Sequence, residues 1–110
     1  MSAKPRRCSK RWLDGDCPDE VLAIIDTGDQ MYSERYDVFY VTPIANVDGV
    51  TWLGYYSIAE RGGGYHGEMP AHEVAAYRYR MKHNYVKWST LPDAVKQSVR
   101  NDLIPIGSEK

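Results

Sequence analysis

The chain is predicted to fold as a small α+β domain, an antiparallel sheet of about four strands packed by two helices. Its length of 110 residues suits one domain, and 43% hydrophobic with 26% charged residues is a globular composition. Strand patterns that include a hairpin fill the first half of the chain, and helical patterns dominate the second half. We divide the chain into a flexible basic arm (1–11), a single domain (12–104) and a tail (105–110).

The first half of the chain contains three strand patterns. Val21–Ile25 is an apolar run closed by turn residues, which predicts a buried strand. Residues 36–42 and 50–58 are rich in aromatic and β-branched side chains, and the turn-forming residues 46–49 lie between them. A β-hairpin over residues 36–58 is therefore expected.

Two details of this hairpin follow from strand geometry. Pro43 cannot donate to a neighbouring strand, so the first arm is expected to end there or to lie at an edge. Side chains of the second arm alternate between two faces. We expect the core face to consist of Val50, Trp52, Gly54, Tyr56 and Ile58.

Residues 61–68 hold four glycines and are predicted to form a loop rather than a regular element. Glycines let backbone amides approach a ligand, and the segment leads into a helix N-terminus, which is a geometry that can hold an anion. The glycine spacing matches neither common nucleotide-binding motif. The simplest interpretation is a connection between hairpin and helix, with a binding loop and a catalytic loop as alternatives.

The second half predicts helices over 71–83 and 91–103, with a short fourth strand at 85–88 between them. Pro70 before the first helix and basic residues near its end are typical of helix termini. Apolar residues recur at helical spacing in the second helix. They are Leu91, Val95, Val99 and Leu103.

The formal net charge of −1 conceals a segregated pattern. Residues 1–11 carry five basic groups and no acid, whereas residues 12–77 hold twelve acids against Arg35 and Arg61. The near-neutral total argues against nucleic-acid binding and wholesale polyanion mimicry. It leaves room for a local acidic patch that docks a basic protein.

A cytoplasmic address without membrane contact is expected. The longest apolar run, Val21–Ile25, is far too short to span a bilayer, and acids stand where a signal peptide needs apolar residues. Cys8 and Cys17 are expected to be reduced thiols, with a local disulfide as the alternative. His66-Gly67-Glu68 lacks the further ligands of a known metal motif, so neither a metal nor a cofactor is expected.

Nine tyrosines and three tryptophans against one phenylalanine form an unusual aromatic set. Tyrosine and tryptophan combine a large contact area with a polar tip, which suits partner surfaces as well as small cores. The aromatic residues are therefore compatible with a partner surface and with a small core. The tyrosines near the hairpin and the glycine segment are Tyr32, Tyr36, Tyr40, Tyr55, Tyr56 and Tyr65.

Four short motifs over roughly residues 20–103 resemble those of small accessory proteins encoded by bacteriophages and mobile elements. The motifs are Val21–Gly28, Arg35-Tyr36-Asp37-Val38, Gly62–Glu68 and Leu91–Leu103. This chain departs from the pattern in its helix at 71–83 and its triple glycine. The resemblance implies a phage accessory gene, acting in the host cytoplasm, and no particular activity.

These observations favour a non-enzymatic protein that binds a host macromolecule and inhibits a defence or regulatory system. The first alternative is a nucleotide or anion binder, in which the glycine amides hold phosphate and Tyr65 stacks on a base. The second is a small hydrolase that uses His66 and Glu68 as acid and base. An exposed sheet edge would also allow a homodimer. The candidate site residues are Arg61, Gly62, Gly63, Gly64, Tyr65, His66, Glu68, Tyr36, Tyr40 and Tyr55.

Overall fold

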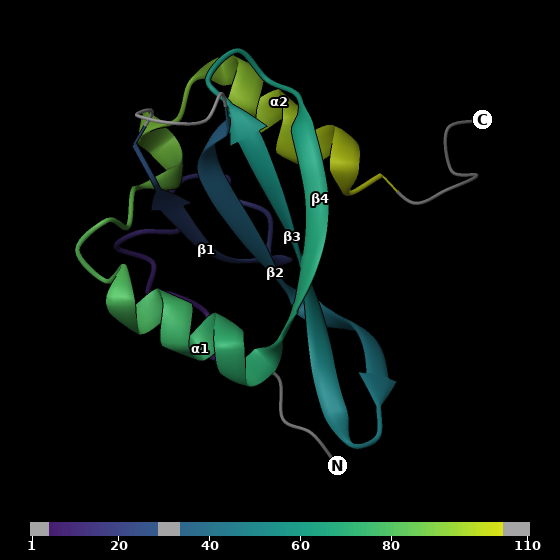
Figure 1. Cartoon of the computed structure of the whole chain (residues 1–110). Coiled ribbons are helices and arrows are strands. Elements are labelled where there is room, and N and C mark those ends of the chain that lie inside the picture. The colour runs from purple at the N-terminus through teal and green to yellow at the C-terminus, as the bar shows by residue number, and fades with distance from the viewer. Residues whose placement is uncertain (1–4, 29–33, 105–110) are drawn as a thin grey trace.

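A computed structural model describes residues 5–28 and 34–104 of the chain. Its sheet is antiparallel, and the strands follow one another in chain order (Figure 1). The strands are β1 (Val21–Asp26), β2 (Glu34–Val47), β3 (Val50–Ala59) and β4 (Gly64–Pro70). The helices are α1 (Ala71–Arg80), the short 3₁₀ helix η1 (Trp88–Thr90) and α2 (Asp93–Asp102). The predicted α+β fold is thereby confirmed. Within the described residues, no helix is both long and apolar enough to cross a membrane.

The two long helices cover opposite faces of the sheet. In Figure 1, α1 lies in front of the strands and α2 lies behind them. Ile58 of β3 packs into the cluster beneath α2, while Leu53 of the same strand packs into the cluster beneath α1. The expectation that only one face of β3 is core is therefore wrong, because a helix seals each side.

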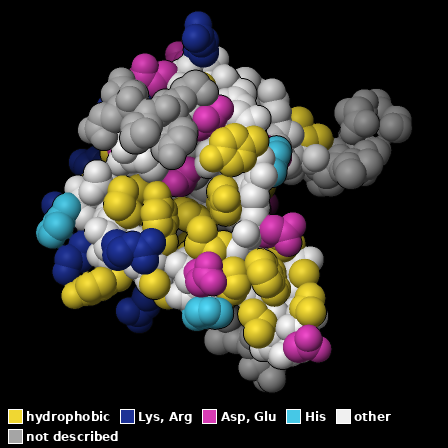
Figure 2. Space-filling view, in the orientation of Figure 1, with side chains coloured by type: hydrophobic (Ala, Val, Ile, Leu, Met, Phe, Trp, Pro, Cys, Tyr) yellow, Lys and Arg dark blue, Asp and Glu magenta, His cyan; other side chains and the backbone are white. Residues whose placement is uncertain are grey.

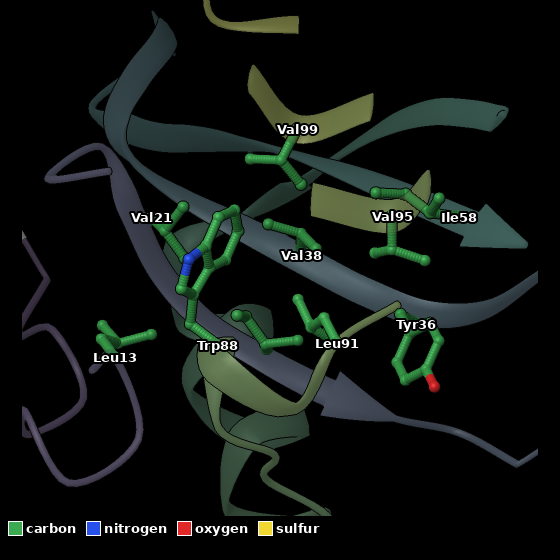
Figure 3. Close-up of a cluster of buried hydrophobic side chains, with 10 residues drawn as sticks. Leu13, Val21, Tyr36, Val38, Ile58, Trp88, Leu91, Val95 and Val99 are labelled. Carbon is green, nitrogen blue, oxygen red and sulfur yellow. The ribbon is translucent and has the colours of Figure 1, made fainter. Parts of the chain in front are cut away.

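The α2 face is built around Trp88, whose side chain is completely buried (Figure 3). Its indole Nε1 donates a hydrogen bond of 2.8 Å to Asp16 Oδ1, and its backbone N–H donates to the Trp12 carbonyl at 2.8 Å. The N-terminal segment is thus attached to the segment that precedes α2. The buried residues of this cluster are Leu13, Val21, Ile24, Tyr36, Val38, Ile58, Trp88, Leu91, Val95 and Val99.

The α1 face has a smaller core with an aromatic character. The ring of Phe39 lies 5.5 Å from that of Tyr55 and 5.7 Å from that of Tyr77, measured between centroids. Tilted ring pairs at such distances are favourable beyond the area they bury. The buried residues here are Leu22, Ala23, Ile25, Phe39, Leu53 and Val74.

The fourth strand lies elsewhere than predicted. Residues 64–70, expected to be mostly loop, pair with β3 along their whole length. Residues 85–88 instead contribute one isolated bridge, between Tyr85 and Ile25, followed by η1. The Val86 N–H donates to the Ile24 carbonyl at 3.1 Å, so this segment covers the outer edge of β1 without becoming a strand.

Glycine serves two purposes between β3 and α1. Gly62 and Gly63 have φ values of 91° and 77°, which suit the tight turn after β3. Gly64 already belongs to β4, and a Cβ atom there would lie 1.8 Å from the carbonyl oxygen of Ser57. The strand therefore needs glycine for close contact with β3. Considered without β3, the same glycines predict a loop.

The hairpin is longer than the predicted 36–58, and its turn is formed by Asp48 and Gly49, both with positive φ. β2 continues through Pro43 because its pairing with β1 ends at Tyr40, so no neighbour on that side requires the missing N–H. Both predicted helices are confirmed, although α1 ends at Arg80 rather than at 83 and α2 spans Asp93–Asp102 rather than 91–103.

The described part of the predicted arm contacts the sheet. Cys8 N donates to the Leu22 carbonyl at 2.9 Å, and Arg7 Nε donates to the Val21 carbonyl at 2.7 Å. Cys8 and Cys17 are both free thiols, and burial raises the pKa of Cys17 to about 11. Residues 1–4 of the arm, Tyr32 and the tail at 105–110 lie outside the described residues.

Candidate functional site

The alternation of β4 divides the candidate residues between the two faces of the sheet. Tyr65 pairs with Ser57 and joins Tyr55 on the α1 face, whereas His66 pairs with Tyr56 on the α2 face. Glu68, two residues after His66, shares the α2 face. Tyr65 is therefore separated from His66 and Glu68 by the sheet, because a strand has replaced the expected loop.

A pocket of about 250 Å³ opens on the α1 face. Figure 2 shows hydrophobic side chains gathered in the middle of this face, beside α1. Four aromatic rings and two carboxylates form much of the lining. The lining residues are Thr27, Glu34, Asp37, Phe39, Tyr55, Ser57, Tyr65, Met69 and Tyr77.

Asp37 is a polar group of this pocket whose two carboxylate oxygens both accept hydrogen bonds. Its Oδ1 accepts a hydrogen bond of 2.6 Å from Ser57 Oγ, and its Oδ2 accepts one of 2.8 Å from the Tyr77 hydroxyl. Burial, reinforced by the charge of Asp37, raises the pKa of Tyr77, so this phenol remains a donor. The carboxylate is consequently held in place among aromatic rings while one side of it borders the cavity.

Sequence reasoning identified Tyr55 and Tyr65 but missed Asp37 and Tyr77. The available signal was a charged residue inside an otherwise apolar and aromatic strand, since Asp37 stands between Tyr36 and Val38. A carboxylate at such a position needs partners, and their identity depends on the folding of β3 and α1 around it. Tyr36 itself belongs to the buried core beneath α2.

The α2 face holds a different arrangement around His66. Its Nε2 lies 2.6 Å from Asp102 Oδ1, and its ring stacks on Tyr56 with 4.1 Å between centroids. A pocket of about 280 Å³ adjoins this pair and is also lined by Tyr40 and Glu68. Burial, together with the charge of Asp102, raises the pKa of Tyr40.

This second pocket brings His66 and Glu68, the acid and base of the hydrolase alternative, into one lining. Its lining contains neither a serine nor a cysteine that could act as a nucleophile. No group of three or more His, Cys, Asp or Glu side chains within residues 5–28 and 34–104 could hold a metal ion. The contacts with Asp102 and Tyr56 fix the orientation of His66 on an exposed strand.

The glycine turn gives the nucleotide alternative few free donors. Gly62 N donates to the Ala59 carbonyl at 2.9 Å, and Gly63 N donates to Ser98 Oγ at 3.1 Å. Gly64 lies in the ladder opposite Ile58. Two of the three amides expected to hold a phosphate thus already donate hydrogen bonds within the protein. Arg61, which precedes them in the chain, is exposed.

Several of the acids that the sequence concentrates in residues 12–77 have partners within the chain. Asp14 accepts from Ser89, and Asp16 accepts from Trp88 as well as from Arg100. Hydrogen bonds to these carboxylates hold the pKa of Asp14 and that of Asp16 below the usual 3.8. Asp14 and Asp16 therefore serve to attach the N-terminal segment to the region around Trp88.

Asp26 makes a bidentate pair with Arg35, at 3.0 Å from Nε and 2.9 Å from the second guanidinium nitrogen, and Arg35 also binds Glu60. Hydrogen bonds from Arg35 lower the pKa of Asp26 below 3.8. A carboxyl group whose pKa is lower in the folded state stabilises that state above its unfolded pKa, and the contribution is lost as pH falls through the folded pKa.

We expect Asp26→Asn to lower the free energy of unfolding at pH 7 by about 1 kcal/mol, a modest value because the pair is partly exposed to solvent. Between pH 5 and pH 2, roughly the range spanned by such shifts, the variant should lose less stability than the wild type. Urea unfolding at several pH values measures both effects. Asp48→Asn in the hairpin turn is the control, and equal acid sensitivity of wild type and Asp26→Asn would contradict the assignment.

The fold defines the class of the molecule as an α+β protein whose four-stranded antiparallel meander carries one helix on each face. No protein-family model, curated protein sequence or solved structure matches the chain. The two pockets and the exposed strand between them are therefore the basis for assigning a function.

Proposed function

We propose that the chain is a non-enzymatic binding protein that takes an ammonium group, such as a lysine side chain of a partner protein, into the pocket of the α1 face. The observation that supports this proposal most is the position of Asp37, a carboxylate held by two hydrogen bonds in a pocket lined by aromatic rings. A fixed anion among aromatic rings is the environment that ammonium ligands prefer.

The chemistry of the pocket favours a cation over other ligands. The faces of tyrosine and phenylalanine rings are negative, so they attract a cation, and the carboxylate adds a full charge. One of these rings already has such a neighbour, since the Arg80 guanidinium lies 5.6 Å from the centroid of Tyr77. Glu34 adds a second acidic side chain to the lining, whereas none of the lining residues is basic.

The proposal retains the expected non-enzymatic role and the expected protein partner, and it changes the surface involved. Tyr55 and Tyr65 remain in the site, but a single carboxylate replaces the broad acidic patch as the charged determinant. A phage accessory protein that engages a lysine of a host defence or regulatory protein would fit the resemblance noted in the sequence. That the partner is a host protein, and that binding inhibits it, are parts of the same proposal.

The test uses three peptides of one sequence that differ at a single position, occupied by lysine, trimethyllysine or norleucine. We expect the two cationic peptides to shift the NMR signals of Tyr55 and Tyr65, while the neutral norleucine peptide does not. Asp37→Asn should weaken binding of the lysine peptide at least tenfold, because a hydrogen bond to a charged group contributes about 1.5–3 kcal/mol. The trimethyllysine peptide, which has no N–H to donate, should also bind more weakly, through loss of the charge attraction alone. Calorimetric titration gives the affinities.

Two variants separate this site from its surroundings. Asp48→Asn removes a carboxylate from the exposed hairpin turn and should leave affinity unchanged. His66→Ala alters the opposite face and should also leave affinity unchanged. Equal binding of the norleucine peptide, or undiminished binding by a folded Asp37→Asn variant, would reject the ammonium assignment.

A further inference from the structure

The outer edge of β4 differs from that of β1. Backbone donors of Cys8 and Val86 reach carbonyls of β1, so that edge is covered. β4 ends the sheet on the other side, and no strand among the described residues pairs with its outer edge. An uncovered edge presents backbone groups to any strand that can match them.

The direction of these backbone groups can be derived from one contact. The Gly67 carbonyl oxygen lies 4.0 Å from the position of a Cβ atom on Gly54, which places this carbonyl toward β3. Backbone direction alternates along an antiparallel strand. The N–H and C=O groups of His66 and Glu68 therefore point outward, on either side of Gly67.

We propose that a second copy of the chain pairs with this edge, with the two β4 strands antiparallel and Gly67 facing Gly67 at the two-fold axis. In this register His66 lies opposite Glu68 of the second copy, and the two residues exchange both backbone hydrogen bonds. By symmetry Glu68 meets His66 of the second copy in the same way. The two strands together extend the sheet to eight strands.

Side-chain chemistry favours a second copy over an unrelated strand. At both ends of the pairing the imidazole of His66, which already contacts Asp102 of its own chain, lies opposite the carboxylate of Glu68 of the second copy, and such polar cross-strand pairs are favourable. On the other face, Tyr65 lies opposite Met69 of the second copy, a favourable contact between sulfur and ring. At the axis the two strands come closest, and Gly67 has no side chain to obstruct them.

The pairing also has a consequence for the α1 face. Tyr65 and Met69 line the pocket described above, so the dimer would place two such pockets next to each other across the axis. His66 and Glu68 lie on the opposite face, which allows the dimer to be altered without changing Asp37 or the tyrosine rings.

Sedimentation and native mass spectrometry of the full chain at micromolar concentration should show a dimer. Glu68→Lys places a lysine opposite His66 of the second copy at both ends of the pairing, and we expect at least a tenfold weaker dimer. Glu20→Lys makes the same charge change at an exposed position in the N-terminal segment and should remain dimeric. A monomeric wild type, or a Glu68→Lys variant as dimeric as the control, would overturn the proposal.

Charge complementation tests the register itself. His66→Glu alone sets glutamates opposite each other and should be monomeric. Mixed with Glu68→Lys, it should form a heterodimer, because every cross-strand pair then joins an acid with a base. Circular dichroism verifies that His66→Glu, which loses the contact with Asp102, is folded. If two folded monomeric variants fail to form the heterodimer, the proposed register is wrong, and if His66→Glu does not fold, the Glu68→Lys result decides alone.

Discussion

Replacing Trp88 with alanine is expected to lower the free energy of unfolding by about 3–5 kcal/mol, the usual cost of removing a large aromatic side chain from a core. The indole is completely buried beneath α2 and binds Asp16 through Nε1. The variant would therefore lose packing on the α2 face and one of the bonds that hold the N-terminal segment. Because most domains are stable by only about 5–15 kcal/mol, part of the population could unfold at room temperature.

Chemical denaturation measures this loss, and Trp52→Ala provides the matched control. Trp52 is only partly buried and lies on the hairpin, so its removal should cost about 1 kcal/mol. If the two variants lose the same stability, Trp88 is not the centre of the α2 face.

A single methyl group at position 64 is expected to cost about 3 kcal/mol. In Gly64→Ala the new Cβ would lie 1.8 Å from the backbone oxygen of Ser57, and no side chain can rotate away to relieve this contact. β4 must then separate from β3 near its start. Thermal unfolding of the variant should show a clearly lower midpoint than that of the wild type.

Gly63→Ala distinguishes this clash from the general cost of replacing a turn glycine. A Cβ atom at Gly63 would meet nothing within 4 Å, so the only penalty is its φ of 77°, worth about 1–2 kcal/mol. Gly64→Ala should be the more damaging variant by a factor of about two. Equal losses would mean that β4 is not held against β3 as described.

Local patterns predicted the parts of the fold whose causes are local. The run Val21–Ile25 is apolar at every position because both faces of β1 are covered. The hairpin turn was predictable because Asp48 and Gly49 are residue types that adopt the positive φ of such turns. β4 was not predicted because its glycines are required by close contact with β3, its partner in the sheet. No pattern within residues 64–70 shows that Ser57 will lie against Gly64.

The candidate site was predictable to a similar extent. The excess of tyrosine pointed to Tyr55 and Tyr65, and both line the α1-face pocket. The carboxylate at the centre was missed because its partners, Ser57 and Tyr77, are 20 and 40 residues away in the chain. His66 and Glu68 were assigned to one loop with Tyr65, and only the strand alternation of β4 shows that they face the other way.

The attachment of the N-terminal segment to Trp88 has a consequence for synthesis of the chain. The strands are consecutive, so the sheet can form from contacts that are near in sequence, but the partners Asp16 and Trp88 are 72 residues apart. While the chain emerges from the ribosome, the part of the outer edge of β1 that Asn84 and Val86 cover remains open until those residues have been made. Among the described residues, a nascent chain thus exposes this part of β1 in addition to the outer edge of β4, and mispairing through β1 is confined to that interval.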